Sequence, residues 1–309
     1  KDLTDSDSGV FEDYGLYTQV EQLNKTALKT HGVDSNGQLY KINSFEFLRN
    51  EDVIRLTTDP AYDQTAFEAL LEIKGDSDHS KLIEMLEVLN DATSSMDDEL
   101  FVTYFDKENI AYWMAFQLLT GNTDTQNRNV YLYSPQNSSK WYLWDWDNDG
   151  MLRRREREII KFSDSESWER GVSNYWGNVL FRRCLQTQSY RNMLDADMKE
   201  LYPYMNKTRI QSMLEHYRSV TETYVWQMPD RMHVPITHAE YEDVLKSIWP
   251  EIEENYNYYW ESYRKPMPFY IGTPQVANGQ LHLNWDSSYN FTVEEIYYTV
   301  ELAKDYLFN

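Results

Sequence analysis

The feature that most constrains this chain is a stretch in which two polar clusters flank a pair of short aromatic segments. It runs from Thr120 to Gly150 and reads TGNTDTQNRNVYLYSPQNSSKWYLWDWDNDG. The segments VYLY and WYLW consist of strand-forming residues and are separated by a Pro/Asn/Ser turn, which predicts a hairpin over residues 130–144. Because a hairpin returns the chain to the edge where it began, the two polar clusters are predicted to meet in space.

The two clusters contain nine acidic or amide side chains. They are Asn122, Asp124, Gln126, Asn127 and Asn129 before the hairpin, and Asp145, Asp147, Asn148 and Asp149 after it. Carboxylates packed this densely repel one another unless a cation or solvent compensates them. A solvated acidic turn explains either cluster alone, but helix, loop, hairpin and acidic loop in this order indicate a binding or catalytic site.

Elements of both kinds are predicted around this stretch. Asp106 is a good N-cap residue, apolar side chains then recur at helical spacing, and Gly121 is a typical helix stop. The elements predicted upstream are a strand over 11–25 and helices over 26–31, 64–74 and 79–89. The predicted fold class is therefore α+β.

Composition excludes several classes of function. The chain has 309 residues, 41% of them apolar, and 51 acidic against 29 basic side chains give a formal charge of −22. This charge disfavours binding to nucleic acid, and no apolar run is long enough for a membrane span. Cys184 is the single cysteine, so the sequence excludes an internal disulfide.

The spacing within the two clusters is that of a phosphotransfer site. In protein kinases a base Asp is followed five residues later by a metal-binding Asn, and a hairpin then leads to an Asp that holds magnesium. Asp124 and Asn129 have this spacing, and Asp145 or Asp147 follows the hairpin. The His-Arg pair that precedes the base in eukaryotic kinases is absent, so an ordinary eukaryotic kinase is disfavoured.

The same residues resemble the spore-coat CotH kinase family, whose signature is a helix, G-N-x-D, N-x-Y-L-Y, a turn and W-D-x-D. The matching stretches are GNTD at 121–124, NVYLY at 129–133 and WDWD at 144–147, and GQLYK at 37–41 is similar to a further family motif. The resemblance covers residues 11–265. It implies transfer of the ATP γ-phosphate to Ser or Thr of protein substrates, with Asp124 as base and Asn129 plus Asp145 or Asp147 as ligands of Mg²⁺ or Mn²⁺.

By the same resemblance, the segment 15–25 is similar to the strand that enters the hinge between kinase lobes. The backbone of Glu21, Gln22 and Leu23 would then meet adenine. An N-lobe also needs a phosphate-covering loop and a phosphate-pairing Lys with its Glu partner, which the residues before this strand cannot supply. We therefore expect sequence before Lys1, or another chain, to complete the lobe.

Three parts of the chain are predicted. Residues 1–160 form a CotH-like kinase core, residues 161–265 its helical extension, and residues 266–309 resemble the beginning of a fibronectin-type-III-like β-sandwich. In this last part QLHLNWD and EEIYYTVELAKD predict strands, with Trp285 at a core position. Because a sandwich needs about 100 residues, we expect it to continue after Asn309. Family and module together place the protein outside the cell or on its surface.

Other interpretations of the acidic loop remain open. Asp145 to Glu156 also satisfies the calcium-loop pattern D-x-D-x-D-G-x₅-E, with Asp149 as a further ligand, although a predicted strand rather than a helix enters it. A Ca²⁺-stabilised adhesion module, or a catalytically silent scaffold of the kinase fold, is therefore an alternative. The basic run at 153–157 suits either phosphate binding or pairing with neighbouring carboxylates.

Overall fold

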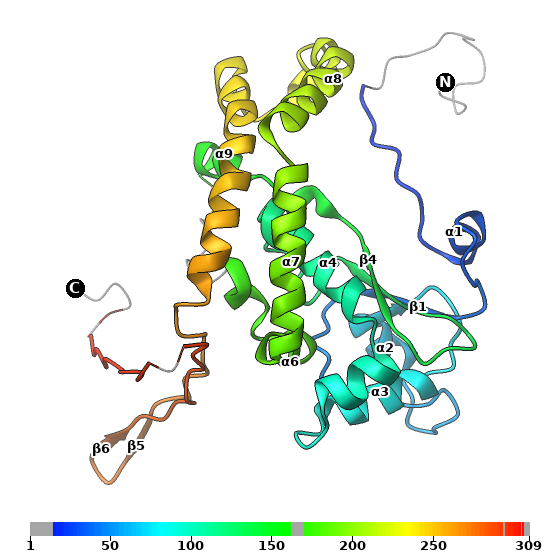
Figure 1. Ribbon diagram of the computed structural model, residues 1–309, viewed down its shortest axis with the longest axis vertical. Helices are drawn as coiled ribbons and strands as arrows, with labels where there is room; N and C mark the ends of the chain where they lie inside the picture. Colours follow the sequence, from blue (N-terminus) through cyan, green and yellow to red (C-terminus); the bar gives the residue numbers. More distant parts are fainter. Residues whose placement is uncertain (1–14, 162–169, 293, 304, 306–309) are drawn as a thin grey trace.

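The computed structural model describes residues 15–161, 170–292, 294–303 and 305 (Figure 1). Its centre is an antiparallel sheet with the strand order β2-β1-β3-β4. The strands are β1 (Gln38–Ile42), β2 (Leu71–Ile73), β3 (Val130–Ser134) and β4 (Tyr142–Asp145). The predicted hairpin is confirmed as β3 and β4, and its register places Val130 opposite Asp145. The two polar clusters therefore begin at the same end of this hairpin.

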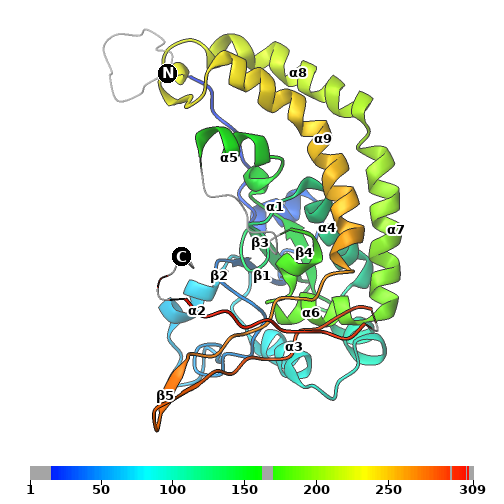
Figure 2. The same ribbon diagram turned by 90° about the vertical axis from the view of Figure 1, so that its left-hand side faces the viewer.

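Helices surround the sheet and extend beyond it. They are α1 (Lys25–Thr30), α2 (Gln64–Leu70), α3 (Ser80–Asn90), α4 (Lys107–Thr120), α5 (Arg154–Ile160), α6 (Val179–Gln186), α7 (Gln188–Tyr204), α8 (Lys207–Val225) and α9 (His238–Ser262). Figure 2 shows α7, α8 and α9 as an arc that passes over α5. The fold therefore combines helices and strands, as predicted. No helix in the described part of the chain is long and apolar enough to cross a membrane.

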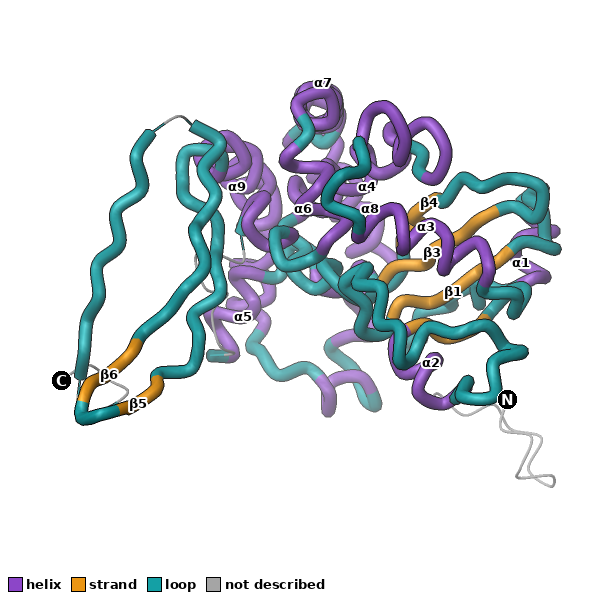
Figure 3. Tube along the Cα trace, turned by 90° about the horizontal axis from the view of Figure 1, so that it is seen from below, coloured by secondary structure: helices purple, strands orange, loops and turns teal. Residues whose placement is uncertain are grey.

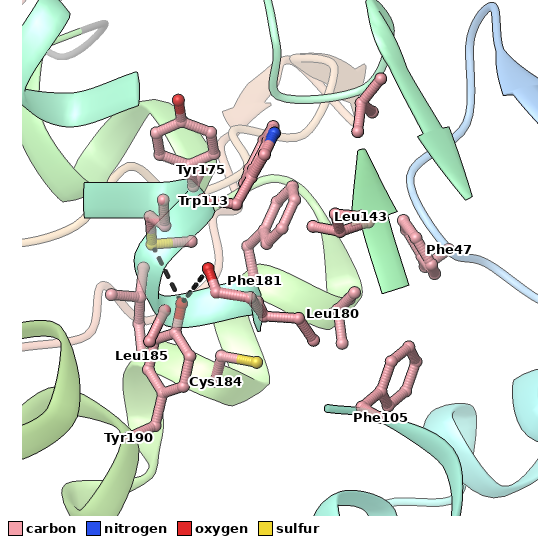
Figure 4. Close-up of a cluster of buried hydrophobic side chains, with 14 of the residues drawn as sticks. Phe47, Phe105, Trp113, Leu143, Tyr175, Leu180, Phe181, Cys184, Leu185 and Tyr190 are labelled. Atoms are coloured by element: carbon pink, nitrogen blue, oxygen red, sulfur yellow. Dashed lines mark hydrogen bonds between the residues drawn. The ribbon is translucent and has the colours of Figure 1, made fainter. Parts of the chain in front are cut away.

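Helix α4 is the buried axis of the molecule. It packs against β4, α7 and α9, and the Trp113 ring stacks on Phe181 of α6 with centroids 5.3 Å apart. Figure 4 shows these rings together with Tyr190, whose hydroxyl donates to the Ile110 carbonyl. Since each such aromatic side chain contributes about 1.5–3 kcal/mol on burial, α4 is held firmly and fixes the loop that follows it.

The two faces of the sheet carry different clusters because side chains alternate along each strand. Tyr40 and Leu132 face the main core, which includes residues of α3 and α4. Leu39, Tyr131 and Tyr133 face a smaller cluster that α1 covers. This second face also carries Trp144 and Trp146, so it leads directly to the acidic loop after β4.

Two upstream predictions need correction. Residues 15–23 have no regular secondary structure, so the strand predicted there is wrong, and residues 11–14 lie outside the described part. Leu16, Tyr17 and Val20 are exposed, because no strand of the described sheet pairs with this segment. The helix predicted over 64–74 ends at Leu70, since residues 71–73 pair with β1 as strand β2. Here sheet pairing overrides helical periodicity.

The helices predicted near residues 26–31, 79–89 and 106–121 are confirmed as α1, α3 and α4. Each begins or ends within a residue or two of the predicted limit. The caps explain this agreement, because Asn24 and Asp106 accept hydrogen bonds from the first-turn N–H groups of α1 and α4. Local capping chemistry is readable from sequence because both partners lie within one helical turn.

The C-terminal part does not form the expected module in the described residues. A short exposed hairpin of β5 (Gln275–Ala277) and β6 (Gln280–His282) lies far from the central sheet (Figure 3). Residues 294–303 contain no strand, which contradicts the strand predicted there. Trp285 is 40% exposed and is therefore not a core residue. A two-stranded ribbon without a second sheet has nothing against which to bury these side chains.

Candidate functional site

The loop that carries the first polar cluster is fixed at its start by the end of α4. Gly121 has a left-handed conformation with φ 64°, and its N–H donates to the last-turn carbonyl of Leu118. A Cβ atom at this position would lie 2.6 Å from the amide nitrogen of Asn255 on α9. Both the backbone conformation and the lack of space therefore require glycine.

Buried polar contacts anchor the middle of this loop. The Thr125 and Tyr175 hydroxyls lie 3.0 Å apart, and the Asn178 amide donates to the Gln126 carbonyl at 2.8 Å. Thr125 and Asn178 are buried. Because buried polar groups are costly to leave unpaired, these contacts hold the loop in one conformation.

Asp124 and Asn129, predicted from their spacing, are in direct contact. The Asn129 amide nitrogen donates to Asp124 Oδ2 at 2.9 Å, and Arg128 Nε pairs with Oδ1 at 2.7 Å. Asn129 has φ 56°, an uncommon conformation for a residue other than glycine. Since the amide nitrogen of Asn129 is used by Asp124, its carbonyl oxygen is the group left for a cation.

The second cluster is linked to the first by amide side chains. Gln117 of α4 donates to Asp145 Oδ1 at 2.8 Å, and Asn122 donates to Asn148 Oδ1 at 3.4 Å. Asp145 is exposed as a residue, but the burial of its carboxyl group beside Gln117 raises its pKa. A Cβ at Gly150 would lie 2.7 Å from Asn122 Oδ1 and 3.6 Å from Asp124 Cβ. The structure therefore brings the two clusters together, as the hairpin predicts.

The charge around Asp147 is negative and incompletely compensated. Burial and the neighbouring Asp149 raise the pKa of Asp147, and Asp124 adds to this effect, whereas Lys41 opposes it. The Lys41 ammonium lies 5.8 Å from the centre of the Trp146 ring. Asp147 also has φ 56°. A divalent cation would relieve the repulsion among these carboxylates, so this donor set fits a hard metal ion.

The hinge-like residues lie beside the face of the sheet that carries the smaller hydrophobic cluster. Leu23 packs against the cluster that includes Tyr131 and Trp146. Glu21 is exposed and accepts from His31 Nε2 at 2.7 Å, and Gln22 is exposed. The structure thus brings Leu23 to the face that carries Trp146, and residues 21–23 belong to no helix or strand. Adenine binding at these three residues stays a prediction.

The calcium-loop pattern does not form an EF-hand. Strand β4 rather than a helix enters the loop, and residues 148–150 form a single 3₁₀ turn. Glu156, the last residue of the pattern, pairs with Arg153 at 2.8 Å. In the part of the chain that the structure describes, one group of three acidic, His or Cys side chains is close enough to share an ion. It consists of Glu222 on α8 with His238 and Glu242 on α9, far along the chain from the acidic loop.

The basic run at 153–157 pairs with carboxylates, which is one of its two predicted roles. Arg154 pairs with Glu254, and Arg155 pairs with Asp243 at 2.6 Å. Both acidic partners lie on α9. These ion pairs fasten α5, which follows the acidic loop, to the helical extension.

Sequence reasoning missed several residues of the site. Gln117 is 1% exposed and contacts Asp145, and its signal is a polar side chain on an otherwise apolar helix face. Lys41 shares the Trp146 face, which the alternation of QLYKI could have indicated. Arg128 carried no local signal, because its contact depends on the fold of the loop.

The comparison with protein families agrees with this geometry. The CotH kinase protein family matches residues 5–259 of the 309, a range that contains every residue of the site. No curated protein matches the chain. Because the match covers most of the sequence, the chain belongs to the CotH kinase family.

Proposed function

We propose that this chain is the catalytic lobe of an ATP-dependent kinase that phosphorylates Ser or Thr hydroxyls of protein substrates. The observation that carries the proposal is the contact between Asp124 and Asn129, with Asp145 and Asp147 brought next to them by the hairpin. Membership of the family implies use of ATP and a divalent metal in general. The spore-coat origin of the family supports acceptor proteins on a spore or cell surface.

In this proposal Asp124 orients the acceptor hydroxyl and accepts its proton. Asp124 and Asn129 are in contact, so the Asp124 carboxylate would serve as the base while the Asn129 side chain would bind the metal. Mg²⁺ or Mn²⁺ would be held by Asn129 with Asp145 and Asp147, and would neutralise charge on the transferring phosphate. The Asp147 side supplies the uncompensated charge that such an ion needs.

The nucleotide base would lie over the face of the sheet that carries the smaller hydrophobic cluster. Tyr131 and Trp146 have their ring centroids 5.3 Å apart there, and Leu23 packs against the same cluster. Lys41 projects from this face and interacts with Asp147. We propose the backbone of Glu21 to Leu23 as the edge that meets adenine.

The test of this function is transfer of labelled γ-phosphate to a Ser-rich acceptor by the full-length protein. Asp124→Asn should lower the rate by about 10²–10⁴-fold, because a positioned general base contributes that factor. The matched control is Asp106→Asn, which removes the same charge but keeps a good N-cap on α4. Equal rates for Asp124→Asn and the wild type would refute the assignment.

A thermal melt distinguishes the remaining alternatives. A ligand that binds the native state raises its melting temperature by mass action. A kinase should be stabilised by ATP with Mg²⁺ or Mn²⁺ and much less by Ca²⁺ alone. Stabilisation by Ca²⁺ alone would instead support the adhesion module, and no response to either would support a silent scaffold.

A further inference from the structure

A cavity of about 180 Å³ adjoins the loop that carries Asp124. Its walls come from the end of α4, the residues 121–123, α5, the turn at Gly171–Tyr175 and α9. In Figure 2, α5 lies within the arc made by α7 to α9. The cavity therefore lies where the site meets the helical extension.

Among the described residues that line this cavity, guanidinium groups outnumber carboxylates. Its lining includes Arg153, Arg154, Arg157 and Arg170, against the carboxylates of Glu158 and Glu251. The whole chain carries a formal charge of −22, so the cavity reverses the sign of its surroundings. Such a concentration of arginine favours an oxyanion, because guanidinium forks match its oxygens.

Buried polar groups complete the lining. Gln117, Asn122, Asn174 and Glu251 line the cavity and are 1%, 2%, 7% and 4% exposed. Gln117 Oε1 is buried and has no hydrogen-bond partner within the described part of the chain. Since a polar cavity of this size holds water or a polar ligand rather than remaining empty, the site is built for polar contact.

Arg170 is held in place without an ion pair in the described regions. Its guanidinium lies 4.7 Å from the centre of the Tyr258 ring and donates to Asn255 Oδ1 at 3.4 Å. Arg153 and Arg154, by contrast, pair with Glu156 and Glu254, which do not line the cavity. Arg170 is therefore oriented in advance, and its charge, which acts on the Glu251 carboxyl group without forming an ion pair with it, can also act on a ligand.

We propose that this cavity binds the phosphate group of a phosphoserine or phosphothreonine already present on the acceptor protein. The inference rests on the proposed kinase function. Asn122 and Thr123 line the cavity and Asp124 is the next residue, so a bound phosphate and the acceptor hydroxyl would contact one short loop. The preferred substrates are then Ser/Thr-rich proteins that carry a phosphate near the next acceptor.

The test measures binding without nucleotide. A fluorescent Ser-rich peptide with one phosphoserine, its unphosphorylated form and inorganic phosphate are titrated into the full chain. The phosphopeptide should bind at least 10-fold more tightly than the plain peptide. Arg170→Met should remove this difference, and Arg170→Lys should restore part of it, because charge is kept while the fork is lost.

The matched control is Arg55→Met. Arg55 pairs with Asp52 and Asp59, and none of these three residues lines the cavity. This variant should keep the phosphopeptide preference in full. Far-ultraviolet circular dichroism of each variant establishes that the comparison is made between folded proteins.

The kinetic arm uses the same two peptides. In the wild type the KM for the phosphopeptide should be about 10-fold lower, and this advantage should disappear in Arg170→Met and persist in Arg55→Met. Equal binding of both peptides, or binding of inorganic phosphate without phosphopeptide preference, would overturn the proposal. Tight phosphopeptide binding with no phosphotransfer by any variant would support the cavity assignment and refute the kinase function instead.

Discussion

The loop after α4 borders two regions of opposite charge. The first contains Asp124, Asp145, Asp147 and Asp149, and the second is the cavity that four arginines line. They meet at Asn122 and Gly150, which line the cavity and also contact the acidic side. The net charge of the chain does not reveal these two regions, because it is a sum over residues that the fold places in separate regions.

The two regions are compensated to different degrees. On the arginine side, Arg153 and Arg154 have glutamate partners. On the acidic side, Arg128 pairs with Asp124, but Asp147 experiences repulsion from Asp149 and Asp124 that Lys41 only partly offsets. A bound cation would therefore stabilise the acidic region more than a bound anion would stabilise the arginine cavity. Substitutions in the acidic region should accordingly have the larger effects.

The largest effect is expected on the acidic side. Asp147→Asn should lower phosphotransfer by about 10³-fold, roughly 4 kcal/mol, because it removes one carboxylate from the proposed hard-cation site. The measurement is the Mg²⁺ dependence of ATP binding together with the transfer rate. Nucleotide binding that keeps its full metal dependence in both Asp147→Asn and Asp145→Asn would show that the metal lies elsewhere.

Asp149→Asn is the control that separates two interpretations. In a kinase site Asp149 is not a ligand, so this variant should retain most of the metal-dependent nucleotide affinity. In a calcium loop all three aspartates bind the ion, so Asp149→Asn and Asp147→Asn would be equally damaging.

A smaller effect is expected at low pH, which should destabilise the sheet that supports both regions. His79 is buried between Tyr40 and Tyr62, whose hydroxyls lie 2.9 and 3.3 Å from its ring nitrogens, and burial lowers its pKa to about 4 from 6.5. The unfolded chain then binds more protons between these values. Stability should therefore fall as pH drops from 6.5 towards 4, by up to about 3 kcal/mol.

Urea unfolding at pH 7 and pH 4.5 measures this loss, with His79→Gln as the comparison. Asp197 works in the opposite direction, because burial raises its pKa to about 6 and its protonation favours the folded state as pH falls. That contribution is common to both proteins and cancels in the difference. A wild type no more acid-sensitive than His79→Gln would contradict the expectation.

The smallest effect is expected at the boundary between the regions. Gly150→Ala would place a Cβ atom 2.7 Å from Asn122 Oδ1, so the Asn122 side chain must move at a cost of about 1–2 kcal/mol. Because Asn122 lines the cavity and contacts Asn148, both phosphopeptide affinity and phosphotransfer should fall together. A change in one alone would show that the two regions are independent.

Local sequence chemistry predicted the parts of the site that lie within one element. The spacing of Asp124 and Asn129, the cap residues of α4 and the β3–β4 hairpin all appear in the structure as contacts. The family assignment agrees with the same motifs. These features are readable because both interacting partners are near each other in the chain or are joined by one tight turn.

Long-range packing decided the rest. The alternating segment at 15–23 had the pattern of a strand, yet no strand in the described sheet pairs with it, whereas residues 71–73 left their helix to pair with β1. Trp285 had a core-like pattern but remains exposed. The arginine cavity combines residues from 117 to 258. Periodicity records which face a side chain prefers, but only tertiary structure supplies the partner that this face meets.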